Sequence, residues 1–235
     1  MISAFQFQQS CHIFSHNARE RRGGIYTGEG QILGKDLVGH QLLIDSRHFS
    51  DLKTFYVPPL LDITIQAILY HLVQPGMRCL EVGTGCGYYS LYLASLVKQT
   101  GQIYGFEANP TYFTFLKKNI KANDLNWITP IQSHIDDSSA SLDDHFKENP
   151  QMDLCKINPI DSLPSILKGM KKLIRTNPKI KIICRTNSQK AIEDLVQDGF
   201  IIYHIPEMKI IEAEEIKKTQ ETKTLLLSRN QIITE

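Results

Sequence analysis

One run of residues in this chain has the types and the spacing needed to bind a small ligand. The run is Cys79-Leu80-Glu81-Val82-Gly83-Thr84-Gly85-Cys86-Gly87, and an amphipathic segment beginning at Tyr88 follows it. Leu80 and Val82 are typical of a buried strand, and Glu81 places a carboxylate inside that strand. Glycine tolerates positive φ and lets a ligand approach the backbone, so the three glycines predict a ligand-binding turn between strand and helix. The carboxylate favours a ligand that carries an ammonium group.

A second carboxylate stands where the next predicted strand ends. Residues 102–107 read as that strand and end in Glu107, and a helix is predicted to begin at Pro110. An acid at this point of a βαβ unit accepts hydrogen bonds from ribose hydroxyls. The alternative is that Glu107 only caps the following helix. Together, the first strand with its acid, the G-x-G-x-G loop, the helix and the second acid match the usual pattern for S-adenosylmethionine (SAM).

Composition limits the class of protein. The chain has 235 residues, with 26 basic and 25 acidic side chains, so we predict one ordinary domain without attraction to nucleic acid or an anionic membrane. No apolar run approaches the length of a membrane span. The five cysteines form no C-x-x-C pair, which predicts free thiols and a reducing, cytoplasmic location. Carboxylates and histidines do not cluster at ligand spacing, so no metal is predicted.

Residues 1–30 read as a polar, irregular N-terminal extension, and residues 31–235 read as the single domain. That domain is expected to open with a small hairpin formed by residues 32–33 and 41–45. The predicted strands are 78–83, 102–107, 128–134, 152–158, 179–185, 199–205 and 222–228. The predicted helices are 60–73, 87–98, 110–123, 162–174 and 188–197. This alternation predicts an α/β, Rossmann-like fold with a seven-stranded, mostly parallel sheet. The last two strands lack a long crossover, which predicts an antiparallel hairpin at the edge of the sheet.

With these elements in place, residues 31–228 resemble the FkbM family of class I SAM-dependent methyltransferases. The stretches that carry the resemblance are Gln74-Pro75-Gly76-Met77-Arg78-Cys79-Leu80-Glu81-Val82-Gly83, Gly105-Phe106-Glu107-Ala108-Asn109-Pro110 and Asp153-Leu154-Cys155-Lys156-Ile157. The resemblance implies the class I methyltransferase fold and O-methylation of a hydroxyl on a carbohydrate-like or small-molecule acceptor. The implied cofactor-binding residues are Glu81, Gly83, Thr84, Gly85, Gly87 and Tyr88 near the methionine end, Glu107, Ala108 and Asn109 near the ribose, and His134, Ile135 and Asp136 near the adenine.

The chain departs from the family after the fourth strand. Where the family reads D-L-I-K-I-D-V-E-G-A-E, this chain reads Asp153-Leu154-Cys155-Lys156-Ile157-Asn158-Pro159-Ile160-Asp161-Ser162-Leu163. Ligands of open α/β sheets bind beyond the carboxyl ends of the strands, so these positions should face the transferred methyl group. Asn158 is a neutral amide that can orient an acceptor but cannot take its proton.

Several residues remain as candidates for that chemistry. Asp161 could be the base, although it or Ser162 could instead cap the next helix. Lys156 could orient a hydroxyl or pair with a carboxylate, and His134 is a further candidate base. Arg185 could bind an anionic acceptor group or form a surface ion pair.

Two other functions stay open. The loss of both family acids favours a SAM-binding module that has lost transfer activity. The pair Asn158-Pro159 is weakly similar to the N-P-P-[YF] motif of amino-methyltransferases, which would make the chain an N-methyltransferase. The sequence does not indicate an oligomeric state.

Overall fold

The computed structural model describes residues 2–20, 24–36, 38–47, 60–137, 140–205, 209–210 and 222–234. The strands are β1 (Ile2–Ser3), β2 (Gly24–Gly28), β3 (Gln31–Lys35), β4 (Gln41–Asp45), β5 (Arg78–Val82), β6 (Gln102–Glu107), β7 (Ile128–Gln132), β8 (Leu154–Ile157), β9 (Lys181–Thr186), β10 (Ile201–His204), β11 (Lys209–Ile210), β12 (Lys223–Ser228) and β13 (Ile233–Thr234). The helices are α1 (Ala4–Glu20), α3 (Leu60–Leu72), α4 (Tyr88–Val97), α5 (Pro110–Ala122), α6 (Leu142–His145), α7 (Leu163–Lys168), α8 (Lys171–Thr176) and α9 (Gln189–Gln197).

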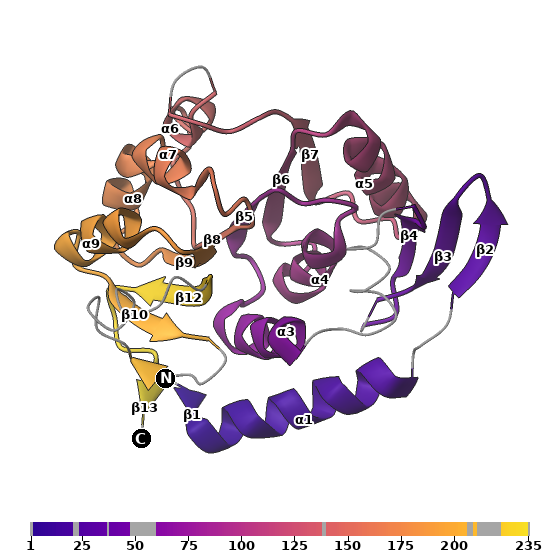
Figure 1. The fold of residues 1–235 in the computed structure, drawn as a ribbon, viewed down its shortest axis with the longest axis horizontal. Coiled ribbons are helices and arrows are strands. Elements are labelled where there is room, and N and C mark those ends of the chain that lie inside the picture. The colour runs from indigo at the N-terminus through magenta and orange to yellow at the C-terminus, as the bar shows by residue number, and fades with distance from the viewer. Residues whose placement is uncertain are drawn as a thin grey trace.

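A large mixed sheet forms the centre of the molecule (Figure 1). Among the described residues its strand order is β11-β10-β12-β9-β8-β5-β6-β7, and the five strands from β9 to β7 are parallel. Strand β12 is antiparallel to both of its neighbours, β9 and β10. The predicted α/β fold and the antiparallel pairing of the last long strands are therefore confirmed. The short β11 is an eighth strand that the sequence did not predict.

The alternating side chains of the strands build a hydrophobic core on each face of the sheet. On one face, Cys79 and Ile183 pack with residues of α3, α4 and α5. On the other face, Leu80 and Cys155 pack with residues of α6, α7, α8 and α9. Because side chains of a strand alternate between faces, Glu81 and Lys156 share the face of Cys79 and Ile183. Both charged side chains are consequently buried beneath α3 and α4.

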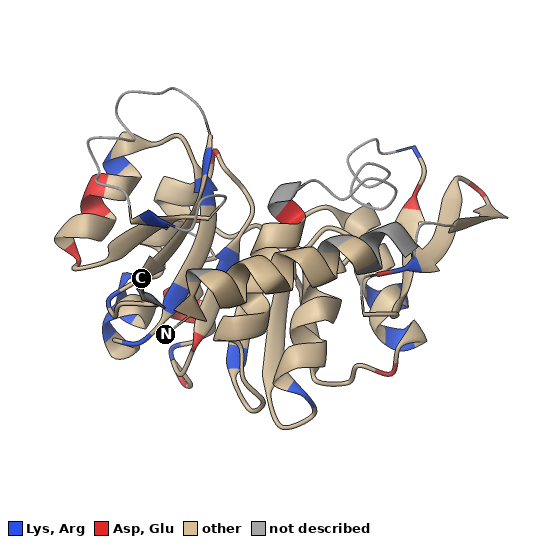
Figure 2. Cartoon of the chain, turned by 90° about the horizontal axis from the view of Figure 1, so that it is seen from below, with Lys and Arg blue, Asp and Glu red and all other residues tan. Residues whose placement is uncertain are grey.

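The N-terminal extension is not irregular, as the sequence led us to expect. Residues 4–20 form helix α1, which lies along α3 on one side of the molecule (Figure 1). Phe14 packs edge-to-face against Tyr70 and Tyr92, and the Ser10 hydroxyl is 2.8 Å from Nε2 of His71. Residues 4–18 contain no charged side chain (Figure 2), so packing against α3, rather than a clear polar face, stabilises this helix.

The predicted helix 162–174 is divided into α7 and α8. Gly169 lies at the break, where a Cβ atom would collide with the backbone oxygen of Asp136. The carboxylate of Asp143 then accepts hydrogen bonds from the amides of Lys172 and Leu173, the second and third residues of α8. This close approach brings the segment after β7 against α7, and only a glycine permits it.

The predicted hairpin is present as β3 and β4, and β2 extends it to a three-stranded sheet. Asn119 of α5 and Asn123, the C-cap residue of that helix, attach this small sheet to the domain. The side chain of Asn119 accepts a hydrogen bond from the amide of Leu43 and donates one to the carbonyl of Leu43. It also donates to the carbonyl of Cys86 in the glycine loop, at 2.8 Å. Asn123 bonds the amide and carbonyl of Gln41 in the same way. The small sheet is thereby connected to the ligand loop through one buried amide.

Candidate functional site

The glycine loop has the backbone conformation that its sequence predicts. Gly83, Gly85 and Gly87 all have positive φ, at 76°, 58° and 100°. A Cβ on Gly87 would lie 2.8 Å from Cδ1 of Leu116, so packing excludes a larger residue there. A Cβ on Gly85 would meet nothing within 4 Å. The backbone of Gly85 is therefore the part of the loop that a ligand can approach directly.

Glu107 is joined to this loop. Its Oε2 accepts a hydrogen bond from the Gly85 amide at 2.7 Å, and its Oε1 accepts one from the Asn109 amide at 2.8 Å. Asn109 is the residue that caps α5, because its side chain accepts hydrogen bonds from the amides of Thr111 and Tyr112. The capping alternative for Glu107 is thus wrong. Its carboxylate is held at the carboxyl end of β6, beside the loop, where an acid can bind ribose hydroxyls.

Glu81 lies in a closed polar network on the other side of the loop. Its Oε2 accepts a hydrogen bond from Ser90 at 2.6 Å, and its Oε1 lies 3.4 Å from Nζ of Lys156 and accepts one from Nδ2 of Asn158 at 3.0 Å. Glu81 and Lys156 are 1% and 2% exposed. We expected Glu81 to hold a ligand ammonium; the ammonium that it holds in this structure is that of Lys156.

Asn158 completes the network. Its Nδ2 also donates to the carbonyl of Gly83 at 2.6 Å, and its Oδ1 accepts a hydrogen bond from Lys156. Lys156 Nζ lies over the ring of Tyr89, 3.8 Å from the centroid, a cation–π contact. The hydroxyl of Tyr89 in turn donates to Asp62 at 2.6 Å. Sequence reasoning missed Ser90, Tyr89 and Asp62; Ser90 had a signal, being the polar residue in an otherwise apolar and aromatic helix start.

Burial perturbs the titration of this network. Loss of hydration raises the pKa of Glu81, although Lys156, Ser90 and Asn158 oppose that shift. Loss of hydration likewise lowers the pKa of Lys156, and the Glu81 charge opposes it. Burial also raises the pKa of Tyr88 and Tyr89, so both phenols stay protonated at neutral pH.

The other predicted cofactor residues have different surroundings. Tyr88 is buried against α3, where its hydroxyl accepts a hydrogen bond from Gln66 at 2.8 Å. Ala108 and His134 are exposed, whereas Ile135 is buried in the core beneath α6, α7 and α8. Asp136 touches Gly169 through its backbone oxygen. The segment 134–136 therefore runs along α7 at the end of β7.

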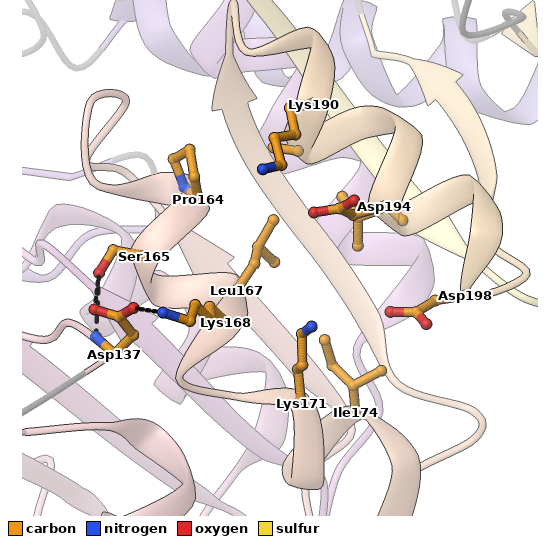
Figure 3. Close-up of a pocket in the computed structure, with 12 residues that line it drawn as sticks. Asp137, Pro164, Ser165, Leu167, Lys168, Lys171, Ile174, Lys190, Asp194 and Asp198 are labelled. Atoms are coloured by element: carbon orange, nitrogen blue, oxygen red, sulfur yellow. Dashed lines mark hydrogen bonds and ion pairs between the residues drawn. The ribbon is translucent and has the colours of Figure 1, made fainter.

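Asp137 fixes that segment. It forms an ion pair with Lys168 at 2.5 Å and accepts a hydrogen bond from Ser165 at 2.8 Å, as Figure 3 shows. These residues line a cavity of about 510 Å³ between α7, α8 and α9, which is separate from the glycine loop. Its charged rim mixes both signs, with Lys171 and Lys190 near Asp194 and Asp198.

The remaining chemical candidates lie after β8 and in the last part of β9. Asp161 is exposed in the turn before α7, and Ser162 occupies the N-cap position without a side-chain cap bond. Arg185 is exposed near the end of β9. Within the described ranges, no group of His, Cys, Asp and Glu is placed to hold a metal ion, and no helix is long and apolar enough to cross a membrane.

Comparison with known proteins finds methyltransferases. The protein-L-isoaspartate(D-aspartate) O-methyltransferase family matches residues 54–142, less than half of the chain. A stretch of 50 residues is 42% identical to the tRNA (adenine(58)-N(1))-methyltransferase TrmI of Thermus thermophilus, covering 21% of this chain and 20% of that protein. A stretch of 49 residues is 37% identical to the protein-L-isoaspartate O-methyltransferase of Methanothrix thermoacetophila, covering 21% of this chain and 23% of that protein. The chain thus spans only about a fifth of the length of these two relatives.

Two solved structures share the fold. TYW2 of M. jannaschii, in complex with AdoMet, matches with a TM-score of 0.57 and 17% identity over 86% of each chain. An rRNA methylase from Streptococcus thermophilus matches with a TM-score of 0.50 and 13% identity, over 71% of this chain and 95% of that one.

The fold is that of the class I SAM-dependent methyltransferases, as the sequence predicted. The prediction that nucleic acid is excluded as a partner is wrong. It rested on the balanced net charge, whereas proteins similar in sequence or fold include a tRNA and an rRNA methyltransferase. The balanced net charge of this chain is therefore not a ground for excluding nucleic acid as a partner.

Proposed function

We propose that this protein is a SAM-dependent methyltransferase that transfers the methyl group to an oxygen atom. The observation that carries the proposal is the paired support of the glycine loop. Glu107 accepts from the Gly85 amide, and Asn158 donates to the Gly83 carbonyl. The loop is held from both sides while the backbone of Gly85 stays open. This arrangement fits a ligand with an amino-acid end and a ribose.

When bound, SAM supplies an electrophilic methyl group on sulfonium. The chain's own part is to bind and orient. Gly83, Gly85 and Gly87 would hold the methionine end, Glu107 the ribose, and residues 134–136 the adenine edge. Positioning of two reactants is a sufficient source of rate for such a displacement. Glu81 would act indirectly, by accepting a hydrogen bond from Asn158, which in turn donates to the loop.

The choice of oxygen has two supports. The resemblance to the FkbM family points to hydroxyls of carbohydrate-like or small molecules, and the matching isoaspartate family is named for O-methyl transfer. Against the N-methyltransferase alternative, Ile160 and Asp161 stand where the N-P-P-[YF] motif has its second proline and its aromatic residue, so the ring that would stack on a target amine is missing. The five free cysteines support a reducing, cytoplasmic location.

Binding and transfer should be measured separately. Titration calorimetry is expected to show micromolar binding of SAM and its demethylated product, and none of NAD. Glu107→Ala should weaken SAM binding by about 1.5–3 kcal/mol, the range for a hydrogen bond to a charged group. Incubation with methyl-labelled SAM and an extract of the source cells should label an acceptor. Tight SAM binding with no label in any fraction would instead identify the chain as a binding module without transfer activity.

A further inference from the structure

We propose that a cavity beneath helix α1 binds a small aromatic carboxylate, at a site that is independent of methyl transfer. The cavity has a volume of about 490 Å³ and lies between α1, the turn that joins β3 to β4, α3 and the last turn of α4. Sites for small molecules have volumes of roughly 300–1,000 Å³, mostly apolar walls and a few polar groups that orient the ligand. The side chains around this cavity meet each of these conditions.

Aromatic and aliphatic side chains form the wall of the cavity. Phe14 of α1 packs edge-to-face against Tyr70 of α3 and Tyr92 of α4, with ring centroids 6.0 Å apart in both pairs. Ile13, Val38 and Tyr70 are 57%, 39% and 54% exposed, so three exposed large apolar side chains stand around one cavity. Exposed apolar side chains that gather in one place mark binding surfaces. The three rings favour a ligand that is itself aromatic, because rings pack well edge-to-face or offset.

His40 supplies a hydrogen-bonding group at the cavity, and a buried acid fixes its ring. Nδ1 of His40 lies 2.8 Å from Oδ2 of Asp36, whose side chain is 2% exposed. Oδ1 of Asp36 accepts hydrogen bonds from the amides of Val38 and His40, so the carboxylate is itself held in place. Nε2 of His40 has no hydrogen-bond partner in the part of the chain that the structure describes. When the ring is protonated, this nitrogen donates to an anion.

Lys98 supplies a positive charge at the other side of the cavity opening. It is the C-cap residue of α4, with φ 60° and ψ −175°, a conformation that glycine adopts readily and other residues avoid. A glycine would end the helix without strain, so the helix end alone does not explain a lysine here. Backbone strain of this kind is concentrated at ligand-binding sites. None of the described residues that line the cavity is acidic, so its charge is complementary to an anion.

The cavity is separate from the glycine loop. The loop leads into Tyr88, the first residue of α4, whereas Ser95, Leu96 and Lys98 line the cavity at the end of that helix. A helix rises about 1.5 Å per residue, so the ten residues of α4 place the two sites about 15 Å apart along its axis. The match to the isoaspartate methyltransferase family begins at residue 54 and therefore excludes Phe14 and His40.

A small aromatic carboxylate satisfies every part of this site. Its ring would pack among Phe14, Tyr70 and Tyr92. Its carboxylate would accept charge-assisted hydrogen bonds from the Lys98 ammonium and from Nε2 of protonated His40. A neutral aromatic compound would leave both of these groups without a partner.

Titration calorimetry of the full chain with benzoate, 2-naphthoate and indole-3-acetate tests the proposal. At least one of the three is expected to bind with a Kd below about 1 mM, and its uncharged amide should bind at least about tenfold more weakly. Decanoate, an anion without a ring, should bind more weakly than the best aromatic acid. The proposal is overturned if none of the three acids binds, if acid and amide differ by less than about tenfold, or if decanoate binds as tightly.

A second titration distinguishes this site from the cofactor site. Saturating S-adenosylhomocysteine should leave the Kd of the aromatic acid within about twofold, because α4 separates the two sites. Displacement of the acid by S-adenosylhomocysteine would place it in the cofactor site and overturn the proposal. Binding of the acid by a protein that transfers no methyl group would leave the proposal intact, so its failure is distinct from that of the proposed function.

Variants of Lys98 separate ligand binding from stability. Lys98→Gly removes the charge and suits the backbone, so it should melt at or above the wild-type temperature yet bind the acid roughly tenfold more weakly. Lys98→Gln should weaken binding by a similar factor. Lys121→Gln is the control, because it changes an exposed lysine in the last turn of α5, and it should leave the Kd within about twofold. Wild-type affinity in both Lys98 variants would show that the acid binds elsewhere and would overturn the proposal.

Discussion

Replacing Asn158 by aspartate would introduce the acid that the FkbM family has at this position, and the structure predicts that the change destabilises this protein. The amide donates one hydrogen bond to Glu81 Oε1 at 3.0 Å and one to the Gly83 carbonyl at 2.6 Å. Asn158→Asp removes both donors. It also places a second carboxylate within hydrogen-bond distance of the buried Glu81.

The magnitude follows from these contacts. A hydrogen bond to a charged group contributes about 1.5–3 kcal/mol and one between neutral groups about 0.5–1.5 kcal/mol. Two carboxylates about 3 Å apart repel by roughly 5 kcal/mol at an effective dielectric of about 20, which a stronger contact with Lys156 and proton uptake partly relieve. We expect a net loss of about 2–4 kcal/mol in the free energy of unfolding at pH 8. At a typical slope this lowers the urea midpoint by about 1 M.

The pH dependence has a definite sign. In the folded variant the carboxyl pair holds a proton more tightly than in the unfolded chain, so its pKa is raised. Stability is then retained below the unfolded pKa and is lost as pH rises through the folded pKa. The deficit of Asn158→Asp should therefore be smaller at pH 5.5 than at pH 8.

Urea unfolding at both pH values measures this effect. Asn158→Ala removes the same hydrogen bonds without adding a charge and should show a deficit that depends little on pH. Asn187→Asp adds the same charge at an exposed position and should change stability by less than about 0.5 kcal/mol. If Asn158→Asp at pH 8 is as stable as Asn187→Asp, or if it gains transfer activity, the structural role of Asn158 between Glu81 and the glycine loop is refuted.

Three further predictions concern the glycine loop, His71 of α3 and the core thiols. Gly87→Ala should destabilise the fold by about 1–3 kcal/mol, since φ is 100° and a Cβ would lie 2.8 Å from Leu116. Gly85→Ala should destabilise the fold less than Gly87→Ala does but should weaken SAM binding. Thermal melting measures the loss of stability and calorimetry measures the loss of SAM affinity. Burial lowers the pKa of His71, so the unfolded chain binds this proton more tightly and stability falls as pH drops through the unfolded value of about 6.5. Thermal melts of wild type and His71→Gln between pH 7.5 and 5.5 should show a shallower decline in the variant. Burial raises the pKa of the thiols of Cys79, Cys155 and Cys184. A thiol reagent should therefore modify these three cysteines only when the protein unfolds, and rapid modification of the native protein would contradict their buried positions.

Local pattern was enough to predict the glycine loop and the acid that lies beside it. Glycine at positions 83, 85 and 87 permits the positive φ that the turn between strand and helix requires, and the end of the predicted strand places Glu107 at the end of β6. The order of strands and helices likewise predicted an α/β sheet. These features depend on residues that are close together in the sequence, so they can be predicted from the sequence without the tertiary structure.

Helix α1 and the break between α7 and α8 depended on packing. Residues 4–18 lack the charged face that marks an amphipathic helix, so contacts of Phe14 with Tyr70 and Tyr92 decide its structure. The break at Gly169 arises because the backbone of Asp136 lies against it. No residue near helix α1 or Gly169 in the sequence identifies the residues that pack against them.

The chemistry of the candidate site was also decided by the tertiary structure. The sequence identified Glu81, Lys156 and Asn158 as separate candidates for binding and catalysis. The parallel pairing of β5 with β8 puts Glu81 opposite Lys156, 75 residues away, and leaves Asn158 to connect them to the loop. A buried charge must find a partner, and only the register of the sheet determines which residue that partner is.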